Sequence, residues 1–316
     1  MSAQRIVSFL PSATEMVCAL GLEDRLIGIT HECDYPPSIQ DRPVVVRSAL
    51  PIESMTQAEI DTAVSARMAD GQSLYEVDEV LLKQLAPDLI LTQDLCQVCA
   101  PSGNEITQAL KLLPSKPEIL WLTPKSLRQI EENLLDIAKA AGCPERAEKL
   151  IAANRASLEE IAFETVAATQ PRVFCMEWID PVYCSGHWVP EMVKIAGGVD
   201  EISRLGTDSV RIPWNEVLEW APDVLVIMPC GCHLNKTMEL VPQIFQQPGW
   251  FDLPAVRKNQ VYAVDASSYF ARPGPRVLEG TKLLAHLIHP TLFSWDGPDT
   301  AYRRVDVNMM QAARSA

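Results

Sequence analysis

The sequence predicts an α/β fold made of two Rossmann-like α/β lobes with parallel sheets, joined by a long rigid helix. Three observations support this prediction: short β-branched runs alternate with helical patterns, one segment occurs in similar form in both halves, and a long helical stretch separates the halves. Strands that alternate with helices are typical of parallel sheets covered on both faces. The 316 residues, 47% hydrophobic and 22% charged, suffice for two domains and exclude a disordered, collagen-like or disulfide-scaffold protein.

Eight short apolar runs are the candidate strands. They cover residues 6–10, 26–30, 44–47, 89–93, 118–122, 173–178, 224–228 and 261–265. Apolar residues three and four positions apart predict helices over residues 13–20, 106–113 and 277–288. Residues 51–74 are polar and helix-prone, and we expect them to form an insertion in the first lobe.

The two halves of the chain contain similar segments. Residues 85–92 read LAPDLILT and residues 220–227 read WAPDVLVI, each a helix end, a Pro-Asp turn and a buried strand. The order of the surrounding strands and helices also matches. We therefore predict an N-terminal lobe at residues 1–124, connecting helices at 125–170, a C-terminal lobe at 171–290 and a tail at 291–316.

Residues 126–168 form a long helical stretch that is interrupted at Gly142-Cys143-Pro144. Glycine at a helix end followed by proline at the next helix start is a normal stop and restart. The second piece, residues 145–167, would be roughly 34 Å long at about 1.5 Å per residue. Because this stretch lacks the Gly/Ser content of a flexible linker, we expect a stiff hinge with limited opening.

Charge and hydropathy exclude several classes of protein. The formal net charge of −14 argues against a nucleic-acid binder and against binding to an anionic membrane. No apolar stretch approaches the ~20 residues that a membrane-spanning helix needs. Residues 1–11 lack the pattern of a secretory signal, so we expect a cytoplasmic rather than a periplasmic location. The nine cysteines are then expected to be thiols rather than a disulfide framework.

Ligands of open parallel sheets bind beyond the carboxyl ends of the strands, where the loops converge. With two facing lobes, such loops would line one cleft, and their aromatic side chains would supply contact area. The candidate ligand contacts are Tyr35, Gln93, Glu177, Trp178, His187, Trp188, Tyr269, Phe270 and Arg272. Two other patterns after predicted strands favour a role in local structure rather than in ligand binding. Ser12 and Glu15 are spaced as a helix capping box, and residues 34–37 (DYPP) first indicate a turn.

Two cysteine pairs follow predicted strands, one pair in each lobe. Cys96 and Cys99 are spaced as Cys-x-x-Cys, and Cys230 and Cys232 as Cys-x-Cys. Four thiolates can bind zinc or an iron–sulfur cluster, whereas buried thiols can also serve as small hydrophobic side chains. No nucleophile elbow, phosphate-binding loop or zinc-protease motif occurs in the chain. A cysteine-dependent enzyme is therefore the weakest of the alternatives.

Several stretches resemble a known family over residues 4–290. They are RIVSFLPSATE at 5–15, DYPP at 34–37, RIPW at 211–214, GW at 249–250 with LPAV at 253–256, and YFARPGPR at 269–276. In these stretches the chain is similar to the substrate-binding proteins of ABC importers for cobalamin and iron–siderophores, the class built on a helical backbone. Within that family it resembles a signal-less, cobalamin-binding-like branch that carries CxxCA, here at 96–100, and GHWVPE, here at 186–191.

The resemblance implies a periplasmic-binding-protein fold of class III and a non-catalytic role. The ligand would be cobalamin, or a related corrinoid or metal chelate, held in the interlobe cleft, with histidine or cysteine able to coordinate the metal. An ABC permease would be contacted through Glu105, whereas Ala271 stands where the family has a second glutamate, and Gln93 stands where a tryptophan is expected. The alternative is a cytosolic metal- or metalloid-binding protein that uses the cleft cysteines.

Overall fold

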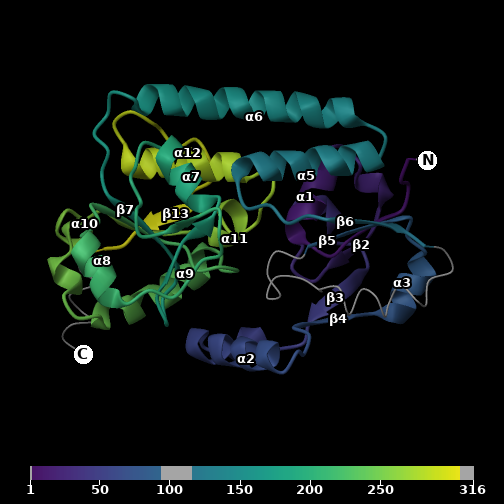
Figure 1. Ribbon diagram of the computed structural model, residues 1–316, viewed down its shortest axis with the longest axis horizontal. Helices are drawn as coiled ribbons and strands as arrows, with labels where there is room; N and C mark the ends of the chain where they lie inside the picture. The colour runs from purple at the N-terminus through teal and green to yellow at the C-terminus, as the bar shows by residue number, and fades with distance from the viewer. Residues whose placement is uncertain (1, 94–115, 307–316) are drawn as a thin grey trace. The chain divides into compact units, whose positions relative to one another are not determined.

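The computed structural model describes residues 2–93 and 116–306. The chain divides into two compact units: Met1–Pro124 with Arg128–Ala152, and Lys125–Leu127 with Ala153–Ala316. Each unit has its own sheet and its own helices (Figure 1), and the predicted α/β class is confirmed. The boundary between the units falls within helix α6 (Pro144–Thr165). The separate assignment of residues 125–170 and 291–316 stays a prediction.

The first unit contains a six-stranded sheet in the order β4-β3-β2-β1-β5-β6. Five strands run parallel, and only β4, at one edge, runs antiparallel to its neighbour β3. The strands are β1 (Ile6–Ser8), β2 (Leu26–Thr30), β3 (Val44–Ser48), β4 (Tyr75–Val77), β5 (Leu89–Thr92) and β6 (Glu118–Trp121). The helices are α1 (Pro11–Ala19), α2 (Gln57–Ala69), α3 (Glu79–Leu85) and α5 (Leu127–Ala140), with 3-10 turns at Glu23–Arg25, Pro37–Ile39 and Ile52–Ser54.

The second unit contains a five-stranded sheet in the order β13-β12-β11-β7-β8, with a parallel pair β9-β10 beside it. Strands β7, β11 and β12 are parallel, and the edge strands β8 and β13 are antiparallel. The strands are β7 (Val173–Trp178), β8 (Tyr183–Cys184), β9 (Gly186–His187), β10 (Arg204–Leu205), β11 (Val224–Ile227), β12 (Val261–Val264) and β13 (Tyr302–Arg304).

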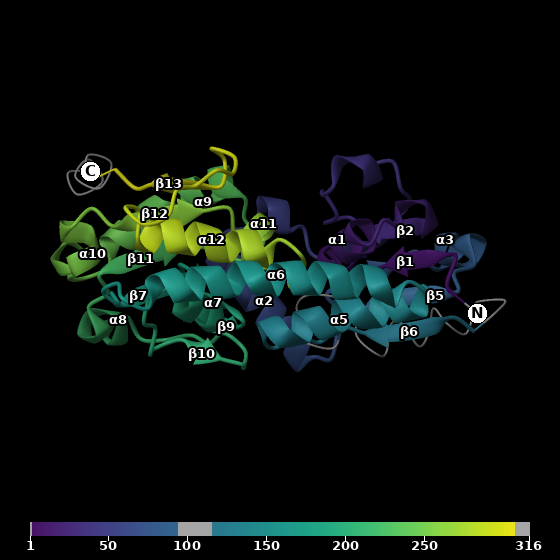
Figure 2. The ribbon, with the colours of Figure 1, turned by 90° about the horizontal axis from the view of Figure 1, so that it is seen from above.

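Six helices lie wholly in the described part of the second unit and α6 lies partly in it, and two views of them are given in Figures 1 and 2. Besides α6 they are α7 (Val189–Ile195), α8 (Trp214–Trp220), α9 (Leu234–Leu240), α10 (Pro254–Arg257), α11 (Ala266–Tyr269) and α12 (Val277–Ile288), with 3-10 turns at Val241–Gln246 and Trp250–Asp252. The core contains Phe174, Trp250 and the buried faces of the central strands. Strands β11 and β12 are buried along their whole length, which explains why they are apolar runs in the sequence.

The repeated segment has the same geometry in both units. In the first unit, α3 ends at Ala86 in the left-handed conformation (φ 42°, ψ 61°), and Asp88 follows the turn. The Asp88 carboxylate accepts a hydrogen bond from the Arg5 amide at 2.9 Å, and the Asp88 amide donates to the Arg5 carbonyl at 3.0 Å. The turn therefore joins the end of a helix to the start of the first strand.

In the second unit, α8 ends at Ala221 with φ 48° and ψ 64°. The Asp223 carboxylate accepts from the Arg172 amide at 3.2 Å, and the Asp223 amide donates to the Arg172 carbonyl at 2.7 Å. The same residue types thus make the same contacts twice, so the sequence similarity reflects a repeated structural element.

All eight predicted strands are present, with ends that differ by at most two residues. The long helical stretch breaks at Gly142 (φ 75°), as expected, because α5 ends at Ala140 and α6 begins at Pro144. The short strands β4, β8, β9, β10 and β13 were not predicted, since two or three residues carry no readable period. Part of the tail pairs with the second sheet through β13, and the predicted helix at residues 106–113 lies outside the described residues.

The predicted capping box at Ser12 and Glu15 is wrong. Helix α1 begins at Pro11, so Ser12 lies inside its first turn, and the residue before the helix, Leu10, makes no side-chain cap. Proline fits the first helical position because its missing amide hydrogen is not needed there. In the described residues no helix is long and apolar enough to cross a bilayer.

Candidate functional site

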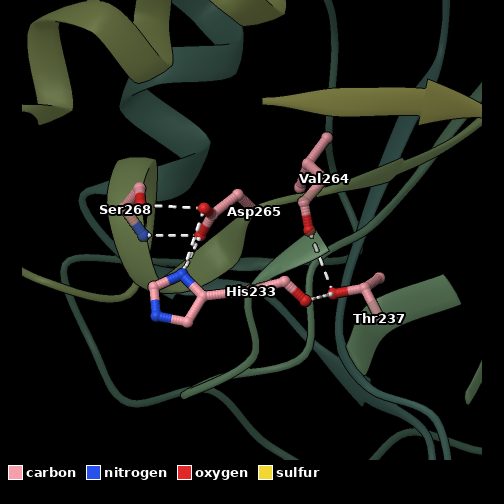
Figure 3. Close-up of polar contacts among 5 residues, drawn as sticks. All are labelled: His233, Thr237, Val264, Asp265 and Ser268. Carbon is pink, nitrogen blue, oxygen red and sulfur yellow. Dashed lines mark hydrogen bonds and ion pairs between the residues drawn. The ribbon is translucent and has the colours of Figure 1, made fainter. Parts of the chain in front are cut away.

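Two loops meet at the carboxyl edge of the second sheet. One follows β11 and ends at His233, directly before α9; the other follows β12 and begins at Asp265, directly before α11. Because β11 and β12 are adjacent parallel strands, both loops leave the same edge of the sheet. The Nδ1 atom of His233 lies 3.0 Å from Oδ1 and 3.1 Å from Oδ2 of Asp265 (Figure 3).

Further hydrogen bonds hold this pair in place. The Asp265 carboxylate accepts from the Ser268 amide and from the Ser268 hydroxyl, each at 2.9 Å, and so caps α11 (Figure 3). The Thr237 hydroxyl donates to the Val264 carbonyl at 3.0 Å and contacts the His233 carbonyl at 3.3 Å. The Ser267 amide donates to the Cys232 carbonyl at 3.1 Å, which ties the two loops together through the backbone.

The contact with Asp265 determines the chemistry of the His233 ring. An ionised carboxylate can only accept hydrogen bonds, so this contact favours the tautomer with hydrogen on Nδ1, in which Nε2 is the nitrogen able to coordinate a metal. Carboxylate–histidine pairs of this kind orient metal-ligating imidazoles and raise their basicity. The His233 side chain is 52% exposed and the Asp265 side chain 12% exposed. The sequence prediction did not select His233, although a histidine at a strand end, directly before a helix, was an available signal.

The cysteines of the same loop give little support to a thiolate metal site. Cys230 is exposed, and Cys232 is partly buried. Burial, opposed by Lys236 and assisted by the carboxylates of Asp265 and Glu239, raises the pKa of the Cys232 thiol to about 11. Residues 2–93 and 116–306 contain no group of three or more His, Cys, Asp or Glu side chains that could hold a metal ion.

Three predicted contact residues form one packed group. The Trp188 indole donates to the Phe270 carbonyl at 2.9 Å, and the rings of His187 and Trp188 are 5.4 Å apart. Trp188 and Phe270 are both buried. Tyr269 is also buried and packs edge-to-face on Trp295, whereas the His187 side chain keeps 15% of its surface exposed.

Glu177 and Trp178 lie at the carboxyl end of β7. The Glu177 carboxyl group accepts from the Gly186 amide at 3.2 Å and from the Ser209 side chain. Burial raises its pKa to about 7 despite these two bonds. The indole nitrogen of Trp178 is buried and has no hydrogen-bond partner in the described chain.

The remaining predicted contacts are placed as follows. Tyr35 follows β2 and is exposed, and Gln93 follows β5 and is buried, both in the first unit. Arg272 follows α11 in the second unit and is partly buried. Cys96, Cys99 and Glu105 lie outside the described residues. The predicted ligand contacts and the predicted interlobe ligand stay predictions.

Two α/β units, each with a parallel sheet and with ring-bearing loops at a sheet edge, define a binding protein of the two-unit α/β class. The chain belongs to the Periplasmic binding protein family, which it matches over residues 6–267. Its fold is that of a class III periplasmic binding protein. Family membership confirms the prediction of a binding protein rather than an enzyme.

Individual proteins agree with this assignment. The vitamin B12-binding protein of Vibrio cholerae serotype O1 is 26% identical over 286 residues, covering 89% of this chain and 87% of that protein. An ABC transporter substrate-binding lipoprotein of Bacillus subtilis is 25% identical over 299 residues, covering 92% and 81%. A periplasmic heme-binding protein of Pseudomonas aeruginosa has a similar solved structure, with a TM-score of 0.70 at 18% identity, covering 96% of this chain and 100% of that one.

The expectation of a cytoplasmic location is wrong. The Bacillus subtilis relative is a lipoprotein, and the solved vitamin B12-binding protein of Vibrio cholerae, with a TM-score of 0.66 at 22% identity over 90% of this chain and 96% of that one, is periplasmic. The relatives therefore point to a location outside the cytoplasm. The residues at the start of the chain were an insufficient basis for the prediction.

Proposed function

We propose that the chain is the substrate-binding component of an ABC importer and that its substrate is a metal-containing macrocycle, with a corrinoid such as cobalamin as the first candidate. Family membership supports the role of substrate-binding component. The relatives named as vitamin B12-binding proteins support the choice of ligand, and heme-binding proteins of the same fold make heme the principal competitor. The proposed permease contact remains Glu105.

The observation that carries the choice of a metal-containing ligand is the His233–Asp265 pair. Asp265 holds the imidazole at 3.0 Å, and the ring is half exposed at the loop edge where ligands of parallel sheets bind. A neutral imidazole is a good ligand for cobalt and for iron. We therefore assign His233 the role of axial ligand to the metal of the bound substrate.

Other side chains would supply the remaining contacts. Tyr35 offers an exposed aromatic ring, and aromatic rings add contact area at a small cost in conformational entropy. The Trp178 indole nitrogen is a buried donor that has no protein partner in the described chain, so a ligand acceptor would satisfy it. Arg272 would pair with an anionic group of the ligand.

Titration with hydroxocobalamin and, separately, with hemin tests this proposal through the visible spectrum. We expect saturable binding of hydroxocobalamin, with a spectral change that reports replacement of the axial water by imidazole. His233→Ala should remove the spectral change and lower the affinity at least 10-fold. Asn235→Ala, which alters an exposed residue in the first turn of the same helix, is the control and should behave as the wild type.

Three outcomes are decisive. Absence of binding up to millimolar hydroxocobalamin overturns the corrinoid proposal, and tight binding of hemin in its place identifies heme as the substrate class. Binding of hydroxocobalamin with the same spectral change in the His233→Ala variant would show that His233 is not the axial ligand.

A further inference from the structure

Two carboxyl groups of the second unit hold the same stretch of chain, residues 185–210. Glu177, at the end of β7, binds the first part of this stretch through the Gly186 amide at 3.2 Å and the last part through the Ser209 side chain. One side chain thus joins two points of the stretch that are far apart along the chain.

Asp200 holds the middle of the stretch. Its carboxyl group accepts from the Ser203 amide at 3.1 Å and from the Ser203 hydroxyl at 2.6 Å. It also accepts from the backbone amides of Ile202 and Cys175, and the latter residue lies on β7 itself. The Ser185 hydroxyl donates to the Ser203 hydroxyl at 2.9 Å, which extends the network to the residue before Gly186.

The stretch is tightly packed where the Glu177 carboxyl group binds it. A Cβ atom on Gly186 would overlap the Ser209 amide and lie 2.7 Å from the Thr207 carbonyl oxygen. The next residue, His187, has a positive φ of 53°, a conformation that is strained for a residue with a side chain. Its Nε2 atom lies 3.1 Å from Oδ1 of Asp208. Small movements of the backbone here therefore move the His187 ring.

We propose that Glu177 and Asp200 are positioning residues that hold the stretch 185–210. Protonation of the Glu177 and Asp200 carboxyl groups thereby changes the placement of His187 and Trp188, and this placement in turn affects ligand binding. The part that concerns ligand binding rests on the proposed function; the part that concerns the stretch itself does not.

The two carboxyl groups titrate at pH values that solution experiments can reach. Burial raises the pKa of Glu177 to about 7, and the negative charge of Asp200 adds to the rise. Burial raises the pKa of Asp200 to about 6, although four hydrogen bonds to its carboxyl group oppose the rise. Both groups therefore change charge between about pH 5 and pH 8.

The other titratable groups around the pair do not share this behaviour. Burial raises the pKa of the thiols of Cys175, on β7, and Cys184, on β8, so both remain protonated. Burial lowers the pKa of His187, on β9, against the effect of Asp208 and with a contribution from Lys125. The positive charge of Arg204, on β10, opposes the rise in the pKa of Cys184. Among these groups, the two carboxyl groups are the acids whose pKa lies at about 6 and about 7.

A neutral carboxyl group is a weaker acceptor than a carboxylate, so protonation weakens the bonds to the Gly186 amide and the Ser209 side chain. As the pH falls from 8 to 5.5, the stretch should become less tightly held. The Gly186 amide reports this directly, because the chemical shift of an amide proton depends on the charge of its acceptor.

The first experiment needs no ligand: the amide resonance of Gly186 is followed by NMR in the wild-type protein from pH 5 to pH 8.5. We expect a titration with an apparent pKa near 7 that is absent in Glu177→Gln and is shifted in Asp200→Asn. Glu201→Gln removes an exposed carboxyl group from the same stretch and is the matched control, expected to titrate as the wild type. A Gly186 resonance that does not move with pH in the wild type overturns the proposal, even if a variant fails to fold.

The second experiment measures the affinity for cyanocobalamin, in which both axial positions of cobalt are already filled, so that coordination by His233 does not contribute. We expect the affinity to fall at least threefold between pH 8 and pH 5.5 in the wild type and in Glu201→Gln, and by less than 1.5-fold in Glu177→Gln. Equal pH dependence in Glu177→Gln overturns the coupling. If no corrinoid binds at any pH, the proposed ligand fails, while the amide titration still decides the role of the two carboxyl groups.

Discussion

Replacing Glu177 by glutamine should make the protein more stable at alkaline pH. The side chain keeps its shape and its ability to accept from the Gly186 amide, but it can no longer acquire a charge in a poorly hydrated environment. The raised pKa of Glu177 means that the folded protein binds more protons than the unfolded chain between pH 4.5 and pH 7. The stability of the wild type therefore falls as the pH rises through this window.

The structure sets the size of the effect. A rise in pKa from 4.5 to about 7 corresponds to at most about 3 kcal/mol of lost stability above pH 7. Because Glu177 keeps part of its surface in solvent, we expect roughly half of this, about 1.5 kcal/mol in favour of Glu177→Gln at pH 8. Well below pH 4.5 the wild-type carboxyl group is neutral in both states, and the gain should disappear.

Urea unfolding followed by tryptophan fluorescence is a suitable assay. Six of the seven tryptophans, all except Trp121, lie in the second unit, so the signal reports mainly on the unit that contains Glu177. The difference in unfolding free energy between Glu177→Gln and wild type is measured at pH 5, 6, 7 and 8, with Glu201→Gln as the control. A difference that is the same at all four pH values would refute the reasoning, because it would show that Glu177 does not titrate in this range.

Three further predictions follow from the same contacts. Asp265→Asn should lower the affinity for hydroxocobalamin about 10-fold or more, because the imidazole ligand loses its carboxylate partner; an unchanged titration would contradict this. Gly186→Ala should lower the unfolding free energy by about 2 kcal/mol or more, because the added methyl group overlaps the Ser209 backbone. Gly71 has a positive φ but no close neighbour, so Gly71→Ala should cost about 1 kcal/mol, and equal losses in urea unfolding would refute the packing argument. At pH 8, iodoacetamide should modify exposed Cys230 at least 10-fold faster than Cys232, because the pKa of the Cys232 thiol is about 11. Peptide mass spectrometry measures both rates, and equal rates would show that burial does not protect Cys232.

Much of the fold was predictable because the central strands are buried on both faces. Strands β5, β11 and β12 are buried along their whole length and almost entirely apolar, and the Ala-Pro-Asp motif marks the helix–strand turn of each unit. The two-residue strands β8, β9 and β10 were not predictable from local pattern. Their pairing depends on contacts such as the Glu177 bond to the Gly186 amide, which no periodicity records.

The candidate site was predicted only in part. The candidate site lies in loops at the strand ends, where the sequence analysis placed its candidates, because parallel strands bring their carboxyl ends to one edge. Within those loops, residue type does not reveal burial: Trp188 and Phe270 are aromatic predicted contacts, and both are buried. His233 follows a predicted strand, but its contact with Asp265, which lies 32 residues later in the chain, is visible only in the structure.

The sequence by itself determined the alternation of strands and helices, the repeat of one helix–turn–strand element, and membership of a binding-protein family, because these depend on local pattern and on motifs that can be read in order. Only the tertiary structure decided which ring is exposed, which carboxyl group holds the His233 imidazole, and which carboxyl groups titrate near neutral pH. Those properties depend on burial and on pairs of residues that are distant in the chain. Hydration and charge act through space, and the order of the residues alone does not specify them.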